Sequence, residues 1–236
     1  LIALEPFPLA LSRVLHIDAV LGALMTVSSL SLLAALRSVR SRWARTGLLL
    51  LSGVTAGLAM LEKTPAVFLA PFAALLLAIE MLRGEETLPS SSQTLRDLVI
   101  WGVTVLGVYI GFWPAMWVDP IGTLGKVWST AVGYAQVGHE PGSYFLGQPV
   151  HDPGWGYYPV VLGFRLSPVV IAGLIASGVT RFATVEKRST RLDRFALLAY
   201  SVLFVAAMGL GAKKIDRYLL PVFPVLGILA AAGILG

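Results

Sequence analysis

The chain contains no cysteine and no asparagine, and it has few charged residues. The lack of cysteine excludes disulfide bonds, thiolate metal ligands and a cysteine nucleophile. The lack of asparagine excludes an N-glycosylation acceptor, which requires that residue. Only 13% of the 236 residues are charged, whereas ordinary soluble domains carry about 25%. A chain of this composition has too few polar groups to cover a folded surface in water.

Three catalytic sequence motifs are also absent. The chain has no G-x-x-x-x-G-K-[ST] phosphate loop, no H-E-x-x-H zinc motif and no G-x-S-x-G nucleophile elbow. These absences argue against a P-loop nucleotide hydrolase, a zinc peptidase and an α/β-hydrolase. The sequence predicts no metal site and no certain cofactor, and it leaves a divalent cation open.

Long apolar stretches dominate what is present. Apolar residues make up 56% of the chain, and the mean hydropathy is +0.79. A helix crosses a hydrocarbon layer of about 30 Å with roughly 20 residues. The stretches that approach this length are Val14–Leu36, Thr46–Leu61, Pro65–Leu82, Leu98–Val118, Val160–Val179, Phe195–Ala212 and a last one from Tyr218. Residues 1–12 are interpreted as the tail of an earlier span. The sequence therefore predicts an all-α, polytopic integral membrane protein with about seven transmembrane helices plus a partial one.

The basic residues indicate how these helices are oriented. Three alternate loops carry 11 of the 18 lysine and arginine residues, namely Arg37, Arg40, Arg42, Arg45, Arg83, Arg96, Arg181, Lys187, Arg188, Arg191 and Arg194. The positive-inside rule assigns such loops to the cytoplasm. The net charge of +5 is thereby explained by membrane orientation, and nucleic acid is excluded as a partner.

Most of the remaining polar residues then fall on the extracytoplasmic side. They lie at the start of the first span, in the turn Glu62–Thr64, in the loop segment 119–159, which is expected to be partly helical, and in residues 213–217. Polar groups that converge at one membrane face indicate a site. A site on that face has no access to cytoplasmic ATP or nucleotide sugars, so an activated substrate would have to arrive on a lipid.

The segment 119–159 is rich in aromatic residues, glycine and proline. Its candidate contacts to a sugar or an acceptor are His139, Tyr144, His151, Trp155, Tyr157 and Tyr158. Aromatic rings stack on the apolar faces of sugars, but they also form the interfacial belts of membrane proteins and pack within loops. Both interpretations stay open.

A basic cluster follows the sixth span. Lys213, Lys214 and Arg217 precede a helix that is expected to begin near Tyr218, and Arg165 lies on the same side. Basic side chains beside the free N–H groups of a helix N-terminus favour an anion site. The alternative is an ordinary interfacial anchor of lysine and arginine.

The start of the first span carries Arg13, His16 and Asp18. His16 and Asp18 are two residues apart and point in different directions on a regular helix, so they form a poor metal pair. An ion pair between Asp18 and Arg13 is one interpretation. Glu62 and Lys63 are equally consistent with a plain turn between two helices.

Four short motifs resemble those of one superfamily. Glu5-Pro6-Phe7 followed by Ser12-Arg13 and Asp18 resembles "D-P-F … S-R-x-x-x-x-D", and residues 57–65 resemble "G-L-A-x-L-x-K-x-P". Residues 144–147 and 154–159 are similar to "F-x-G … G-W-x-Y-Y-P", and residues 214–221 are similar to "K-x-x-R-Y-L-L-P". In this order they resemble the protein O-mannosyltransferase and aminoarabinose-transferase-like superfamily, which are membrane glycosyltransferases of the GT-C fold.

The resemblance implies transfer, with inversion, of a glycosyl group from a polyprenyl-phosphate-linked sugar to an acceptor protein, lipid or glycan on the extracytoplasmic face. By its motifs it implies donor-phosphate binding by Lys214 and Arg217, and site organisation by Arg13, Asp18, Lys63 and Tyr218. Position in the sequence adds Lys213 and Arg165 to the first group and His16 to the second. The catalytic base of that group is an acidic residue of an earlier loop, expected upstream of Leu1. Residues 1–236 are accordingly interpreted as an internal fragment of one transmembrane glycosyltransferase domain in a prokaryotic plasma membrane, and the fragment alone is expected to be catalytically inactive.

Two other classes of protein compete with this interpretation. A transporter or flippase for an anionic lipid or solute could use the same basic cluster, but it should show broken helices and ionisable groups near the middle of the membrane. A structural membrane subunit would leave the aromatic segment unexplained.

Overall fold

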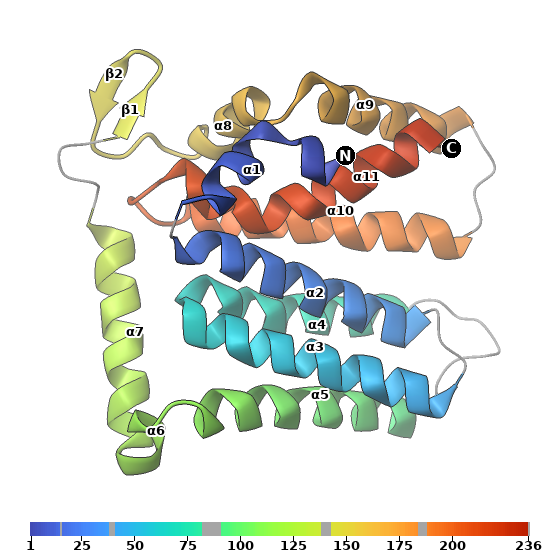
Figure 1. The fold of residues 1–236 in the computed structure, drawn as a ribbon, viewed down its shortest axis with the longest axis vertical. Helices are drawn as coiled ribbons and strands as arrows, with labels where there is room; N and C mark the ends of the chain where they lie inside the picture. The colour runs from blue at the N-terminus through green and yellow to red at the C-terminus, as the bar shows by residue number, and fades with distance from the viewer. Residues whose placement is uncertain (15, 38–40, 82–90, 138–142, 184–187, 236) are drawn as a thin grey trace. The chain divides into compact units, whose positions relative to one another are not determined.

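The computed structural model describes residues 1–14, 16–37, 41–81, 91–137, 143–183 and 188–235, and nearly all of them are helical (Figure 1). The chain forms two compact units. Unit 1 combines Leu1–Ala19 with Leu124–Gly236, and unit 2 is Val20–Thr123. Each unit is considered separately below.

Unit 2 is built from long apolar helices. It contains most of α2 (Ile17–Arg37), then α3 (Arg42–Glu62), η2 (Thr64–Phe68), α4 (Leu69–Met81), α5 (Ser91–Gly111), α6 (Ala115–Val118) and the first residues of α7 (Pro120–Gln136). Lys63, in an extended conformation, ends α3, and Pro65 begins the next turn without needing an N–H partner. Helices α2, α3 and α5 are also joined by polar groups: the Ser28 and Ser52 hydroxyls donate to each other's backbone carbonyls, and the Trp101 indole donates to the Ser52 hydroxyl at 3.0 Å.

Buried ion pairs join the helix ends of unit 2 that carry the predicted cytoplasmic charges. Arg37 at the end of α2 contacts Glu80 of α4 at 2.6 Å, and both side chains are buried. Arg45 in the first turns of α3 donates through Nε to Asp97 of α5 at 2.8 Å and also contacts it through Nη2. The sequence predicts that these arginines are loop residues that mark the cytoplasmic side. In the structure they form ion pairs between helices.

Unit 1 pairs two helices at close range. It contains η1 (Ile2–Leu4), α1 (Pro6–Ser12), the rest of α7, α8 (Tyr157–Arg165), α9 (Pro168–Ala183), α10 (Arg188–Gly209), η3 (Asp216–Val222) and α11 (Phe223–Leu235). A hairpin of β1 (Ser143–Phe145) and β2 (Gln148–Val150) is antiparallel, with Phe145 opposite Gln148. Its turn places Leu146 and Gly147 at positive φ, as a two-residue hairpin of this twist requires. Glycines Gly173 and Gly233 let α9 approach α11, because a Cβ on Gly233 would lie 2.2 Å from the Gly173 carbonyl oxygen.

A sharp break separates α8 from α9, whose axes differ by 112°. Pro168 disfavours a helical conformation at the residue before it and begins α9. The carboxylate of Glu5, only 2% exposed, accepts a hydrogen bond from the Ser167 N–H at 3.1 Å and another from the Ser167 hydroxyl. Glu5 therefore satisfies donors at the start of α9, where the helix dipole also favours a negative charge.

The described residues are nearly all helical, and several of the helices are long and apolar, which fits the prediction of an all-α membrane protein. Among the described residues, five helices are long and apolar enough to cross a membrane, or six if α8 and α9 form one bent span. These five are Ile17–Arg37, Arg42–Glu62, Gln93–Gly111, Thr190–Gly209 and Asp216–Leu235. The predicted span Pro65–Leu82 corresponds to a shorter apolar helix, Thr64–Glu80. The total of about seven spans stays a prediction, as does the partial span at residues 1–12, where α1 has seven residues.

Close packing of α3 against α5 gives a testable expectation. A Cβ on Gly57 would lie 2.7 Å from the Cβ of Val108 and 2.9 Å from the Val105 carbonyl oxygen, so the helices must separate to accept it. We expect Gly57→Ala to lower the free energy of unfolding by about 1–3 kcal/mol, as overpacking does. The measurement is thermal unfolding in detergent. Gly47→Ala on the same helix is the control, because nothing lies within 4 Å of that position. Equal melting temperatures for the two variants would contradict the packing.

Candidate functional site

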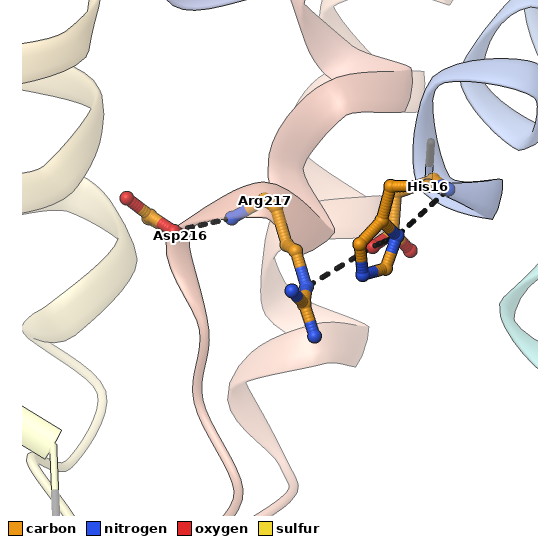
Figure 2. A network of polar contacts seen from close by, with 4 residues as sticks. His16, Asp216 and Arg217 are labelled. Carbon is orange, nitrogen blue, oxygen red and sulfur yellow. Dashed lines mark hydrogen bonds and ion pairs between the residues drawn. The ribbon is translucent and has the colours of Figure 1, made fainter. Parts of the chain in front are cut away.

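Polar side chains from three segments of unit 1 meet around the start of η3. They come from the start of α2, from η3 itself and from the end of α8. We call this set the Arg217 cluster, and its members are His16, Asp18, Arg165, Asp216 and Arg217. Ile215 is extended before η3, and Pro221 within η3 cannot donate a backbone hydrogen bond. Figure 2 shows the Arg217 side chain extending from this turn toward His16.

Asp18 is the buried centre of the Arg217 cluster. Its side chain is 2% exposed, and its Oδ2 atom lies 2.9 Å from His16 Nδ1 and 3.2 Å from Arg217 Nε. Asp18 also lies in the first turn of α2, where the helix dipole favours a carboxylate. A carboxylate held in this way fixes the orientation of both the imidazole and the guanidinium. The expected pair of Asp18 with Arg13 is replaced by these contacts, and Arg13 lies exposed at the end of α1.

Arg217 presents its terminal nitrogens away from Asp18. Its Nε faces Asp18, and its backbone N–H donates to Asp216 Oδ1 at 2.8 Å. Within the described residues, no hydrogen bond or ion pair is recorded for Nη1 or Nη2, and the side chain is 35% exposed. Two parallel guanidinium N–H groups match two oxygens of a phosphate or carboxylate. The terminal nitrogens of Arg217 can therefore bind an oxyanion.

Arg165 stands on the other side of Asp216. Its Nη2 donates to Asp216 Oδ2 at 2.6 Å, and its guanidinium lies 4.9 Å above the centre of the Phe7 ring. Asp216 thus links Arg165 to the backbone of Arg217. The Arg165 side chain is 48% exposed, so this pair contributes little to stability but holds a second cation near the first.

Lys214 has a different position from the one that the sequence predicts. Its side chain is 2% exposed, and its ammonium group donates to Asp152 at 2.7 Å and to the Gly211 carbonyl at 2.6 Å. Lys214 therefore ties the segment after β2 to the loop before η3. It does not extend alongside Arg217 toward a common anion. The hydrogen bond from Lys214 holds the pKa of Asp152 below its ordinary value, and the Gly154 N–H lowers it further.

Lys213 and the neighbouring backbone attach α7 to the same loop. The Lys213 ammonium lies 4.8 Å above the centre of the Tyr134 ring, and the Ala212 N–H donates to the Ala135 carbonyl at 2.7 Å. The loop before η3 is therefore held on two sides, by α7 and by Asp152.

The predicted sugar contacts separate into buried and exposed groups. Tyr157 and Tyr158 are 8% and 1% exposed and pack with Leu219 and Phe223 in a hydrophobic cluster, so their burial does not support a sugar contact. Tyr144 and Trp155 are exposed, and the Trp155 ring lies close to Gly209 at the end of α10. His151 is exposed, and His139 lies outside the described residues.

The remaining predicted residues have less defined roles. Tyr218 is partly buried and close enough to Asp18 for the two to interact electrostatically. Lys63 caps α3 in unit 2. Within the described part of the chain, no group of three or more histidine, cysteine, aspartate or glutamate residues could hold a metal ion.

Two acidic residues that position the site are not predicted by the sequence. Glu5 stands out only as part of a motif, and Asp152 carries no signal of a functional site. Each lies beside a proline, as Glu5-Pro6 and Asp152-Pro153, and acidic residues next to proline are typical of turns and caps. That signal identifies a structural role but not the partner.

No protein-family model matches the chain, and no match was found among the curated proteins or the solved structures.

The Asp152–Lys214 pair gives a prediction about pH. Because folding lowers the pKa of Asp152, its contribution to stability is complete above the ordinary carboxyl range, about pH 4. The contribution is lost as the pH falls through the lowered value in the folded protein. We expect Asp152→Asn to speed amide hydrogen exchange in residues 148–156 at neutral pH, because Lys214 loses its carboxylate partner in that segment. The wild type should approach the variant as the pH falls below about 4, after correction for intrinsic exchange.

The control for this measurement is Asp119→Asn. Asp119 also accepts a hydrogen bond from a backbone N–H, that of Gly122, and it is exposed. Exchange in residues 148–156 should not respond to this change. If Asp152→Asn left the exchange of that segment unchanged at pH 7, the pair would not hold the loop.

Proposed function

We propose that this chain binds the phosphate of a polyprenyl-phosphate-linked sugar through the Arg217 cluster and takes part in transfer of the glycosyl group to an acceptor on the extracytoplasmic face. The observation that carries the proposal is Arg217, a partly exposed arginine whose Nε faces the buried carboxylate of Asp18, which His16 also contacts, next to long apolar helices. An oxyanion site at such a place suits an anionic headgroup whose tail lies in lipid. Two of the four motifs that resemble the lipid-dependent glycosyltransferases, the one that ends at Asp18 and the one at residues 214–221, include residues of this cluster.

The chemistry of the site follows from its charges. Among the described residues, the cluster and its loop bring together four cations, Arg165, Lys213, Lys214 and Arg217, with the carboxylates of Asp18, Asp152 and Asp216. When a glycosyl group leaves a lipid phosphate, negative charge develops on that phosphate. Preorganised cations in a partly dry site stabilise such charge more strongly than water does. Arg217 supplies the direct contact, while Lys214 and Lys213 hold the loop that positions it.

A transporter for an anionic lipid or solute is the second candidate, and one observation favours it. The break of 112° between α8 and α9 resembles the discontinuous helices of transporters, which bind substrates at such breaks. The buried carboxylate of Glu5 lies at this break. Its two hydrogen bonds to Ser167 also account for it as a cap, so we favour the enzyme.

The experiment uses the purified full-length protein in nanodiscs with a radiolabelled polyprenyl-phosphate sugar and a panel of protein, lipid and glycan acceptors. The proposal expects label on an acceptor, and it expects this transfer to be lost in Arg217→Ala. Proteoliposomes loaded with the same donor separate the two candidates. Movement of donor across the membrane without transfer would favour the transporter and contradict the enzyme.

A further inference from the structure

His16 shares one carboxylate oxygen with Arg217. The distance of 2.9 Å from His16 Nδ1 to Asp18 Oδ2 is that of a charge-assisted contact. The backbone N–H of Asp18 donates to Nδ1 at 3.5 Å, which needs a neutral ring with Nδ1 unprotonated. A proton on Nδ1, as in the imidazolium, would instead face the carboxylate, which accepts but does not donate. In either form the nitrogen that does not contact Asp18 is Nε2.

The His16 ring and the Arg217 guanidinium are oriented by the same Asp18 oxygen, and His16 is 28% exposed. Figure 2 shows one edge of the His16 ring turned toward the Arg217 side chain. We infer that an oxyanion on Arg217 has one oxygen on the side of His16 Nε2.

We propose that His16, held by Asp18, gives a proton from Nε2 to the departing phosphate of the lipid-linked donor. This inference rests on the proposed function. The acceptor oxygen forms a bond to the anomeric carbon of the sugar, and the bond from that carbon to the phosphate oxygen breaks with its electron pair on the phosphate. The acceptor's hydroxyl proton passes to water. The His16 proton neutralises one of the two charges on the released phosphate monoester, and His16 then regains a proton from water.

The two cationic side chains therefore have separate tasks. Arginine stays charged throughout and can bind the phosphate but cannot transfer a proton to it. A phosphate monoester takes up its second proton at about pH 6, and histidine is the side chain that exchanges protons in this range. Arg217 binds the anion, and His16 removes the charge that would otherwise hold the product in the site.

Among the described residues of unit 1, the charged and titratable groups near His16 come from two segments. Asp18 lies on the same segment of the chain, Arg217 and Tyr218 come from η3, and Arg13 lies exposed at the end of the preceding α1.

The test is the pH dependence of transfer by wild type and His16→Gln, measured in nanodiscs with radiolabelled donor. We expect His16→Gln to lower turnover at pH 7 by about tenfold, which is less than the roughly 100-fold or more usual for acid–base catalysis, because phosphate is already a good leaving group. The wild-type rate should fall as the pH rises and the imidazolium loses its proton. The glutamine variant should lose this alkaline fall, while its affinity for the donor stays within about twofold of the wild type. Lys126→Gln on α7, which removes an exposed basic side chain outside the cluster, should behave like the wild type.

The outcomes separate this inference from the proposed function. Transfer with the same rate and pH profile in His16→Gln as in wild type would overturn the role of His16 and leave the proposed function standing. If His16→Gln instead removed a fall in the transfer rate at low pH, His16 would act as a base. That result would also overturn the inference. No transfer by the wild type would overturn the proposed function, and the inference with it.

A second measurement avoids substitution in case His16→Gln does not fold. Diethyl pyrocarbonate modifies neutral histidine, and mass spectrometry locates the modified residue. We expect activity to fall in step with modification of His16, and we expect polyprenyl phosphate to slow that modification. Full activity in protein modified at His16 would contradict the role.

Discussion

Arg217→Lys is expected to lower the turnover of a lipid-linked donor by about tenfold or more, which corresponds to about 1.4 kcal/mol of activation free energy. Arg217 faces Asp18 with Nε and keeps two terminal nitrogens for an anion. Lysine has a single ammonium group, so it cannot contact Asp18 and two phosphate oxygens in this fixed geometry. The loss should appear in turnover because the contact is strongest when charge has developed on the phosphate.

The fold should tolerate this change, since Arg217 is 35% exposed and lies outside a packed core. Thermal unfolding in detergent provides that control, and Lys126→Gln provides a matched change of an exposed cation. If Arg217→Lys folded normally and its turnover were unchanged, the phosphate contact would be contradicted. The cluster would then be interpreted as an interfacial anchor.

Asp97→Ala is expected to have the largest effect on stability. It would leave Arg45, whose side chain is 13% exposed, as a buried cation without its carboxylate. Breaking a buried pair in this way costs about 3–5 kcal/mol. Replacing both residues, as Arg45→Met with Asp97→Leu, should restore most of the stability, because an apolar pair avoids the desolvation of two charges.

The matched control is the half-exposed pair of Arg165 and Asp216. Arg165→Met should change the free energy of unfolding by less than about 1 kcal/mol, the usual value for a surface pair. If Asp97→Ala and Arg165→Met proved equally stable by thermal unfolding, the buried ion pair would not support unit 2.

The two pairs also show what the sequence can and cannot predict. Hydropathy identifies Arg45 as a residue at a helix end, since it stands between two apolar stretches. It cannot identify Asp97 as the partner, because that contact depends on how α3 packs against α5. The helical class follows from apolar runs of sufficient length, whereas the break before Pro168 and the cap from Glu5 depend on tertiary contacts.

The same distinction applies within the candidate site. The dense run of basic residues identifies the loop before η3, and the structure keeps Arg217 partly exposed there. The run does not reveal that Lys214 is buried against Asp152. Aromatic content likewise identifies residues 144–158 as unusual. It cannot separate Tyr158, which is packed in the core, from Tyr144 and Trp155, which are exposed, because burial is decided by partners distant in sequence.

Binding of a polyprenyl phosphate without sugar tests most directly whether the Arg217 cluster recognises a lipid-linked phosphate. The measurement is native mass spectrometry of wild type, Arg217→Ala and Lys126→Gln in detergent, with the matching polyprenol as the uncharged competitor. The account predicts that wild type and Lys126→Gln bind the phosphate equally and prefer it to the polyprenol. It also predicts that Arg217→Ala binds the phosphate about tenfold more weakly or worse, a difference of about 1.4 kcal/mol. Equal binding of the phosphate by wild type and Arg217→Ala, or no preference for the phosphate over the polyprenol, would contradict it.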